Sequence, residues 1–373
     1  MWGSYCHVPF CVSRCAYCDF TSQRRDEASV LQWRRALARE VEAAADAVGD
    51  APADTLFIGG GTPTALTPAA LVETVALFKS RFRLTPGAEV TVEANPESFT
   101  EEMAQAMADA GVNRLSFGVQ TFDDAVLRII GRRHDAAAAE EAFWRARRNG
   151  FENCSLDLIY GLPETTLAGW REDVARALAL RPNHLSLYAL TLEPGVPLSR
   201  DRARYRFPDD DEVAAMYYAA RDDITTAGYF QYEISNFARP GYECRHNLKY
   251  WRDEDWLGFG PSAASHWRGG RYRNPAALAA YAAAAAAGRW PLGDEEPSDP
   301  YREMRTAFVL GLRLTAGVDV GVFTHRYGVN PSAYFEAELA ELAAAGLLDT
   351  GGGRVRLTRE GLFLSDEVFA RLI

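Results

Sequence analysis

The sequence predicts an α/β fold, a partial (β/α)6 barrel of the TIM type followed by a small α+β domain. Over the first two-thirds of the 373 residues, short apolar runs alternate with amphipathic stretches. Several amphipathic stretches end at a glycine, the usual residue just after a helix. Six such units fit a partial barrel better than a closed eightfold one.

Each unit of the barrel pairs a strand with the helix that follows it. The strands are expected at residues 3–8, 55–58, 89–93, 114–118, 155–159 and 184–189. The helices between them are expected at residues 30–48, 69–82, 101–110, 136–149 and 167–180. This alternation implies a parallel sheet, because each helix carries the chain back to the starting edge. A doubly wound open sheet is the alternative that the pattern leaves.

The pattern weakens after the sixth strand. A helix is expected at residues 208–228, and residues 229–275 show no simple period. Residues 276–287 are almost all Ala, the best helix former, and predict another helix. The Pro-rich stretch at residues 291–300 is typical of a linker. We therefore expect two domains, at residues 1–290 and 291–373.

The second domain resembles a winged helix. Its helices are expected at residues 302–314, 320–327 and 333–345, with a last helix at 360–372. Two short strands are expected at residues 347–349 and 355–357. Because the chain carries a net charge of −11, a packing or lid role fits this module better than DNA reading.

Composition excludes several classes of protein. Hydrophobic residues make up 48% of the chain and charged residues 24%, which is typical of a globular protein. The negative charge argues against a nucleic-acid partner. No run of 18 apolar residues predicts a membrane span, and no secretory signal precedes the first cysteines. We expect a cytoplasmic protein, associated with a membrane only through a client.

Four of the six cysteines crowd the start of the chain. Cys11, Cys15 and Cys18 have the spacing C-x3-C-x2-C, so three thiolates can converge on one metal site. Soft thiolates suit iron–sulfur clusters and zinc, but structural zinc needs a fourth ligand, and none follows at a suitable spacing. Three cysteines on a four-iron cluster leave one iron open to a small molecule. The sequence therefore predicts a [4Fe–4S] cluster.

The segment from Tyr5 to Phe20 resembles a known family. C-x3-C-x-Y-C is the signature of the radical S-adenosylmethionine (SAM) superfamily, and the wider segment looks like that of the HemN/HemW family. The resemblance runs over nearly the whole chain. It implies that the open iron of the cluster binds SAM, and that the first domain is a barrel of the radical SAM type with a HemN-type C-terminal domain.

The resemblance and the ends of the strands together give candidate SAM contacts. Glycines allow close approach of the backbone, Glu93 can accept from an ammonium group, and Asp157 can bind ribose hydroxyls. By resemblance, the loop with Gly60 contacts the methionyl amino group and Arg132 reaches the SAM carboxylate. The full set is Tyr5, Tyr17, Gly60, Gly61, Thr62, Glu93, Gln120, Arg132, Asp157, Ile159 and Thr191.

One position separates two branches of the family. Coproporphyrinogen III dehydrogenases carry a fourth cysteine two residues after the third, where this chain has Phe20. The HemW-like branch of haem chaperones commonly has Asp-Phe there, as Asp19 and Phe20 do. The resemblance therefore implies a haem chaperone that delivers haem to apo-proteins, as a monomer or a cluster-dependent homodimer. Physiological turnover of SAM is left open.

A second motif points to haem. Residues 246–251 read His-Asn-x-x-Tyr-Trp, which resembles the haem-associated HNxxYW motif of the HemW branch. Imidazole is a common axial ligand of haem iron, and aromatic rings pack on a porphyrin. The haem candidates are His246, Asn247, Tyr250 and Trp251. The competing interpretation is a hydrogen-bonded core histidine beside structural aromatics, with Cys244 as a small buried residue.

The alternative function is a radical SAM enzyme that acts on a porphyrin. It would be a coproporphyrinogen III dehydrogenase, a class C methyltransferase or a haem-degrading enzyme. A third interpretation is a structural iron–sulfur protein, which would bind no SAM.

Overall fold

The computed structural model describes residues 1–373 except 294, 297 and 298. These three residues belong to the linker expected at residues 291–300, so that part of the expectation lies outside the described residues. No helix among the described residues has the length and apolar character that a membrane span requires.

Six parallel strands form the centre of the fold, as the sequence predicts. They are β1 (Trp2–Val8), β4 (Ala53–Gly60), β5 (Leu84–Ala94), β6 (Arg114–Gln120), β7 (Asn153–Tyr160) and β8 (His184–Ala189). They lie side by side in chain order. Most of their residues are buried, but apolar side chains alternate with buried polar ones such as Thr91, Ser116 and Ser155.

Further strands extend the sheet at both edges. Beyond β1 lie β11 (Trp256–Phe259), which is parallel to it, and then antiparallel β12 (Ala264–Trp267) and β13 (Gly270–Arg273). Beyond β8 lie antiparallel β10 (Asn236–Ala238) and β9 (Phe230–Gln231). The sequence did not predict these strands, because elements of two to four residues are too short to show a period.

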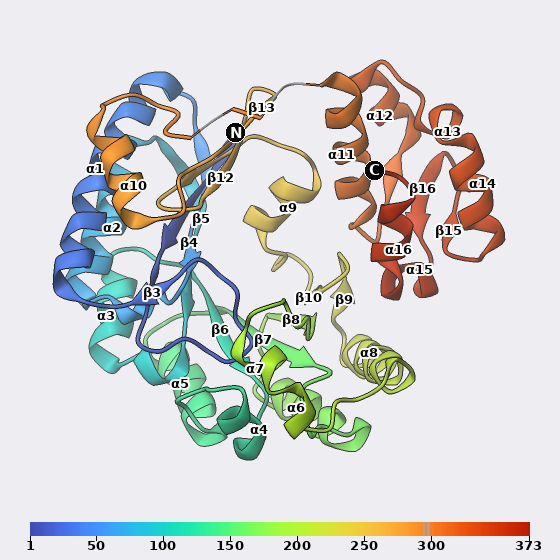
Figure 1. Cartoon of the computed structure of the whole chain (residues 1–373), viewed down its shortest axis with the longest axis horizontal. Coiled ribbons are helices and arrows are strands. Elements are labelled where there is room, and N and C mark those ends of the chain that lie inside the picture. The colour runs from blue at the N-terminus through green and yellow to red at the C-terminus, as the bar shows by residue number, and fades with distance from the viewer. Residues whose placement is uncertain (294, 297–298) are drawn as a thin grey trace.

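The helices of the repeat cover the outer face of the sheet (Figure 1). They are α1 (Glu27–Val48), α2 (Pro68–Arg81), α3 (Glu101–Asp109), α5 (Ala136–Arg148) and α6 (Leu167–Ala179). Because they lie on one face of a curved sheet, the fold is the expected partial barrel and not the doubly wound alternative. Buried Trp33, Phe78 and Trp170 anchor three of them to the sheet.

Shorter elements complete the first part of the chain. The helices are α4 (Asp124–Ile129), α7 (Pro197–Arg200), α8 (Asp210–Thr226), α9 (Arg245–Trp251) and α10 (Leu278–Ala286). Single turns of 3-10 helix lie at Pro63–Ala65, Pro96–Ser98 and Arg202–Arg204. Helix α9 lies on the inner side of the curved sheet, away from the outer helices (Figure 1). It carries the His-Asn-x-x-Tyr-Trp motif.

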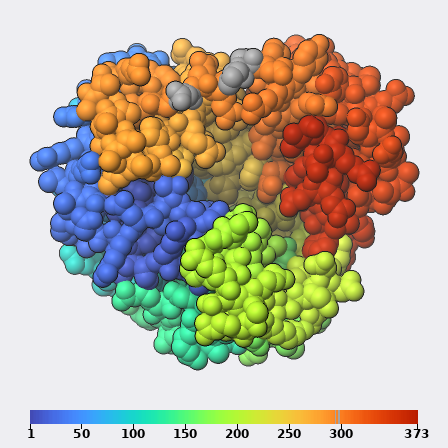
Figure 2. Space-filling view, in the orientation of Figure 1, coloured from blue at the N-terminus to red at the C-terminus, as the bar shows by residue number. Residues whose placement is uncertain are grey.

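The C-terminal part is a separate α+β body beside the barrel (Figure 1). Its helices are α11 (Pro300–Leu312), α12 (Val320–Tyr327), α13 (Pro331–Tyr334), α14 (Glu336–Ala344), α15 (Arg359–Phe363) and α16 (Ser365–Ala370). A small antiparallel sheet joins β14 (Val318–Asp319), β16 (Arg354–Leu357) and β15 (Leu348–Asp349). The helices expected at 333–345 and 360–372 are each divided in two. Figure 2 shows a hollow between this body and the barrel.

Candidate functional site

The cysteine loop is held at both ends. Strands β2 (Phe10–Cys11) and β3 (Gln23–Arg24) pair in parallel at its base. At its far side, Ala16 donates its backbone N–H to the Ile130 carbonyl at 2.9 Å and accepts from the Leu198 N–H at 2.8 Å. The loop is therefore held by the segments that follow β6 and β8. This places all three cysteines at the carboxyl ends of the parallel strands.

The three thiols suit an iron–sulfur cluster. Cys11, Cys15 and Cys18 are half-buried, form no disulfide and line one cavity. Cysteine thiolates are the usual ligands of such clusters, and three of them leave one iron of a four-iron cluster without a protein ligand. The donor set thus fits the predicted cluster.

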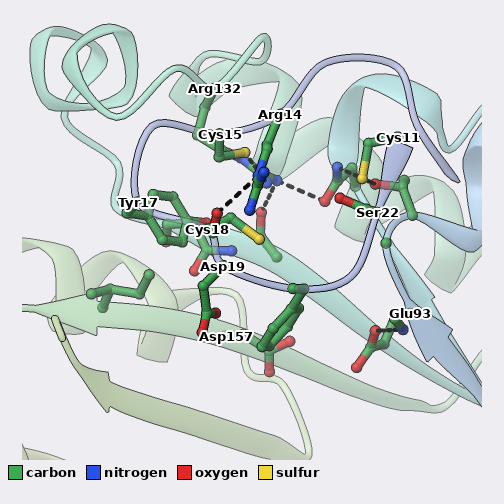
Figure 3. A pocket seen from close by; sticks show the side chains of 18 of the residues that line it. Cys11, Arg14, Cys15, Tyr17, Cys18, Asp19, Ser22, Glu93, Arg132 and Asp157 are labelled. Carbon is green, nitrogen blue, oxygen red and sulfur yellow. Dashed lines mark hydrogen bonds between the residues drawn. The ribbon is translucent and has the colours of Figure 1, made fainter. Parts of the chain in front are cut away.

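One cavity of about 350 Å³ collects the predicted cluster and SAM residues, with the exception of Tyr5. Figure 3 shows the cysteine loop on one side of this cavity and Glu93 and Asp157 on the other. Besides the cysteines, it is lined by Tyr17, Gly60, Gly61, Thr62, Glu93, Gln120, Arg132, Asp157, Ile159 and Thr191. The carboxyl ends of the parallel strands bring these distant positions together.

The glycine loop after β4 lies directly against the cysteine loop. Gly60 has φ +107°, a conformation that side chains rarely adopt. A Cβ at Gly61 would lie 2.7 Å from the Phe10 carbonyl oxygen. Thr62 donates its N–H to that carbonyl at 2.7 Å, and its Oγ1 lies 3.5 Å from Cys11 Sγ. The loop therefore needs glycine for its approach to the predicted cluster ligands.

Two buried carboxyl groups face the cavity. Burial above all, and the Asp157 charge next, raise the pKa of Glu93 to about 7. Glu93 accepts the backbone N–H of Gly60 at 3.0 Å. Burial also raises the pKa of Asp157, although Ser116 Oγ donates to both of its oxygens at 3.0 and 3.1 Å. Such perturbed acids in a cavity are typical of a functional site.

Arg132 joins the cysteine loop to the strand ends. Its Nη2 donates to Asn95 Oδ1 at 2.8 Å and to the Gly118 carbonyl at 2.5 Å, and its Nη1 lies 3.6 Å from Cys15 Sγ. Asn95 also donates to Thr62 Oγ1 at 3.2 Å. Asn95 was not among the SAM contacts expected from the sequence. Its position two residues after Glu93, directly after the same strand, indicates that it belongs to this site.

One predicted cavity residue, Gln120, has an unusual backbone conformation. Gln120 has φ +71°, and the β6–β7 register shifts between Gly118 and Gln120. This bulge turns Gln120 toward the cavity at the end of its strand. Tyr188, Leu190 and Phe20 also line the cavity, and none was expected to bind SAM.

Tyr5 is not among the residues that line the cavity. Its Oη is 3.1 Å from His7 Nδ1, and its ring stacks at 6.4 Å from the His246 ring. The structure therefore separates Tyr5 from the other predicted SAM residues and joins it to helix α9.

The motif on α9 is enclosed. His246 is only 1% exposed. Its Nδ1 shares a hydrogen bond with Thr55 Oγ1 and its Nε2 one with Tyr250 Oη, both at 2.8 Å. Trp251 packs against the guanidinium of Arg313, 4.2 Å from its ring centroid. Asn247 and Tyr250 are half-buried. Both ring nitrogens of His246 are thus engaged in this conformation.

Comparisons with known proteins identify the family of the chain. Residues 5–177 match the radical SAM superfamily, and residues 299–364 match the HemN C-terminal domain. The haem chaperone HemW of Bacillus subtilis is 36% identical, over 100% of this chain and 99% of that protein. HemW of Escherichia coli is 38% identical, over 69% of this chain and 68% of that protein.

A solved structure shares the fold. Coproporphyrinogen III oxidase (HemN) from Escherichia coli, a radical SAM enzyme, matches with a TM-score of 0.87 and 24% identity. The match covers 100% of this chain and 89% of that one. On these similarities and on the cysteine motif, the chain belongs to the HemW family of the radical SAM superfamily.

Proposed function

We propose that this protein is a haem chaperone that holds a [4Fe–4S] cluster and SAM, binds haem and delivers it to apo-proteins. The observation that carries the proposal is the similarity to haem chaperones over the whole chain. Delivery would take place in the cytoplasm, including to clients at a membrane, by a monomer or a cluster-dependent homodimer. The matched C-terminal region supports a division into domains at residues 1–290 and 291–373.

Phe20 supports the chaperone over porphyrinogen chemistry. It stands where the dehydrogenase branch has a fourth cysteine, and its side chain is 61% exposed at the cavity. A phenyl ring has no thiol to offer to a cluster or to a substrate radical. The surroundings of the cavity thus lack the group that marks the enzymatic branch.

The residues that line the cavity suit a cluster and SAM. Cys11, Cys15 and Cys18 would hold the cluster, which supplies an open iron and an electron when bound. Glu93 would accept from the methionyl ammonium, Arg132 would pair with the SAM carboxylate, and Asp157 would accept from the ribose hydroxyls. The remaining proposed contacts are Tyr17, Gly60, Gly61, Thr62, Gln120, Ile159 and Thr191.

SAM affinity should depend on pH through Glu93. The carboxylate is the form that attracts an ammonium group, and its pKa of about 7 means that it is protonated at lower pH. We expect the Kd for SAM to be constant well above pH 7 and to rise, approaching tenfold per pH unit, below it. Equilibrium binding between pH 5.5 and 8.5 (about three units around that pKa) measures this. Glu93→Gln should bind weakly at every pH, and a wild-type profile that stays flat would contradict the assignment.

Haem binding is the test of the function itself. We propose that His246, Asn247, Tyr250 and Trp251 form the haem site, and that iron coordination by His246 requires Tyr250 or Thr55 to release one ring nitrogen. Anaerobically reconstituted protein is titrated with haem and followed by absorption and EPR, wild type beside His246→Ala. Saturable uptake that the variant lacks is expected.

The same protein is then incubated with coproporphyrinogen III, SAM and a reductant. The chaperone should leave the porphyrinogen unchanged. Formation of protoporphyrinogen IX, or the absence of haem uptake by the wild type, would overturn the proposed function.

A further inference from the structure

Helix α9 carries a histidine and a tyrosine into the interior of the barrel. His246 lies between Thr55 on β4 and Tyr250 one turn later, with a hydrogen bond of 2.8 Å to each. A Cβ at Gly3 on β1 would lie 3.0 Å from His246 Nδ1 and 2.8 Å from the Lys249 side chain. The helix therefore packs directly on the strands, with the imidazole pressed against the inner face of the sheet.

Aromatic rings continue from His246 toward the cavity. The His246 ring stacks on Phe57 at a centroid distance of 5.4 Å and on Tyr5 at 6.4 Å. Phe57 and Tyr5 are themselves 6.1 Å apart. Because side chains on one face of a strand are two residues apart, Thr55, Phe57 and Gly59 form successive levels on β4. The stack rises from α9 to the level of the glycine loop.

Glu93 lies at the top of this stack. A Cβ at Gly59 would lie 2.7 Å from Glu93 Oε2 and 2.9 Å from Phe57 Cε1, so the carboxyl group and the ring meet above this glycine. Burial chiefly raises the pKa of both the Tyr5 and the Tyr250 phenols; the next cause is the Glu93 charge for Tyr5, and the Cys244 thiol followed by Glu93 for Tyr250. Both hydroxyl groups therefore interact electrostatically with the Glu93 carboxylate, which faces the cavity.

The base of the stack is fixed. Glu89 accepts the backbone N–H of His246 at 3.1 Å and that of Arg245 at 3.2 Å. Glu89 and Glu93 are on the same face of β5, four residues apart, so α9 is tied to the strand that carries the cavity acid. On the other side, Trp251 packs on Arg313 of the C-terminal part of the chain. Each end of the motif is thus held by a different part of the molecule.

We propose that His246 and Tyr250 are positioning residues for SAM, which set the place of Glu93 through Phe57 and Tyr5. The proposal rests on the proposed SAM site, and it gives the motif on α9 a role in the absence of haem. Tyr5, Phe57, His246 and Tyr250 do not line the cavity themselves but form a layer of rings behind Glu93, which does. Removal of a residue of this layer lets Glu93 move away from the ammonium group and lets water reach it, both of which weaken SAM binding.

The test measures SAM affinity without haem. Tyr250→Phe keeps the ring and removes only the hydroxyl that bonds His246; His246→Ala removes the base of the stack. Both should raise the Kd for SAM about tenfold, the lower end of what supporting groups around a ligand contribute. His246→Gln, which keeps a donor and an acceptor, should recover part of the affinity. Tyr281→Phe is the matched control, because it removes another fully buried phenol hydroxyl, which donates to Glu40 and not to a residue of the cavity.

Two further readouts separate positioning from a loss of fold. Tyr250→Phe should keep the iron content and the Tm of the wild type, while the SAM-induced change in the EPR signal of the reduced cluster should need about tenfold more SAM. In a Glu93→Gln background, Tyr250→Phe should have little additional effect, because the two residues act through one contact chain. If His246→Ala does not fold, Tyr250→Phe carries the test.

The outcomes differ for the two proposals. A fully loaded Tyr250→Phe protein that binds SAM like the wild type would overturn the positioning role and leave the proposed function intact. Equal weakening by Tyr281→Phe would overturn it as well. A wild-type protein that takes up the cluster but binds no SAM would instead overturn the proposed SAM site, and the positioning role with it.

Discussion

Replacement of Cys15 by alanine is expected to abolish the cluster. The residue supplies one of the three thiols that line the cavity, and a [4Fe–4S] cluster with an open iron has no fourth protein ligand in reserve. Reconstituted wild type should hold about four iron and four sulfide per chain, and Cys15→Ala close to none. Iron analysis and visible absorption measure this. SAM binding through the open iron should disappear together with the cluster.

Cys154→Ala is the control for this loss. Cys154 is fully buried behind the sheet, where burial raises the pKa of its thiol to about 12, and it lies outside the cavity. Its replacement by alanine should leave the iron content unchanged and lower only the stability, by roughly 1 kcal/mol for the small cavity left. Full iron content in Cys15→Ala, or iron loss in Cys154→Ala, would mean that the cluster is held elsewhere.

The barrel could be predicted because its pattern is long and regular. All six parallel strands were expected, since they are buried runs separated by amphipathic helices, several of which end at a glycine. The edges of the sheet could not be predicted in this way. Strands β9 to β13 have two to four residues each, and the pairings that attach them to the barrel, β10 with β8 and β11 with β1, join distant parts of the sequence and depend on tertiary contacts.

The site was predictable where chemistry requires a residue type. Cysteines at a fixed spacing, glycines in a loop and acids at strand ends identify the residues that line the cavity. Tyr5 was expected only by resemblance, and it contacts His7 and His246 and is not among the residues that line the cavity. His246 shows another limit, since a sequence motif does not reveal that both ring nitrogens are already bonded.

Arg132→Met is expected to remove most of the SAM affinity while the cluster remains. The guanidinium holds Asn95 and the Gly118 carbonyl, and its Nε is buried with no hydrogen-bond partner among the described residues. A buried cation with a spare donor beside a cavity is suited to a carboxylate. Charge-assisted hydrogen bonds contribute about 1.5–3 kcal/mol, so the Kd for SAM should rise roughly ten- to a hundredfold.

The control for this variant is Arg145→Met, which removes another half-buried arginine that donates to a carbonyl, that of Phe99, away from the cavity. It should bind SAM like the wild type. The iron content of Arg132→Met decides between two explanations of weak binding. Arg132 Nη1 lies 3.6 Å from Cys15 Sγ, so a damaged cluster site would lower iron and SAM together. Weak SAM binding at full iron content would mean that the guanidinium contacts SAM itself, because the three cysteines then hold the cluster without Arg132. Unchanged SAM affinity would contradict the assignment of Arg132 to the SAM site.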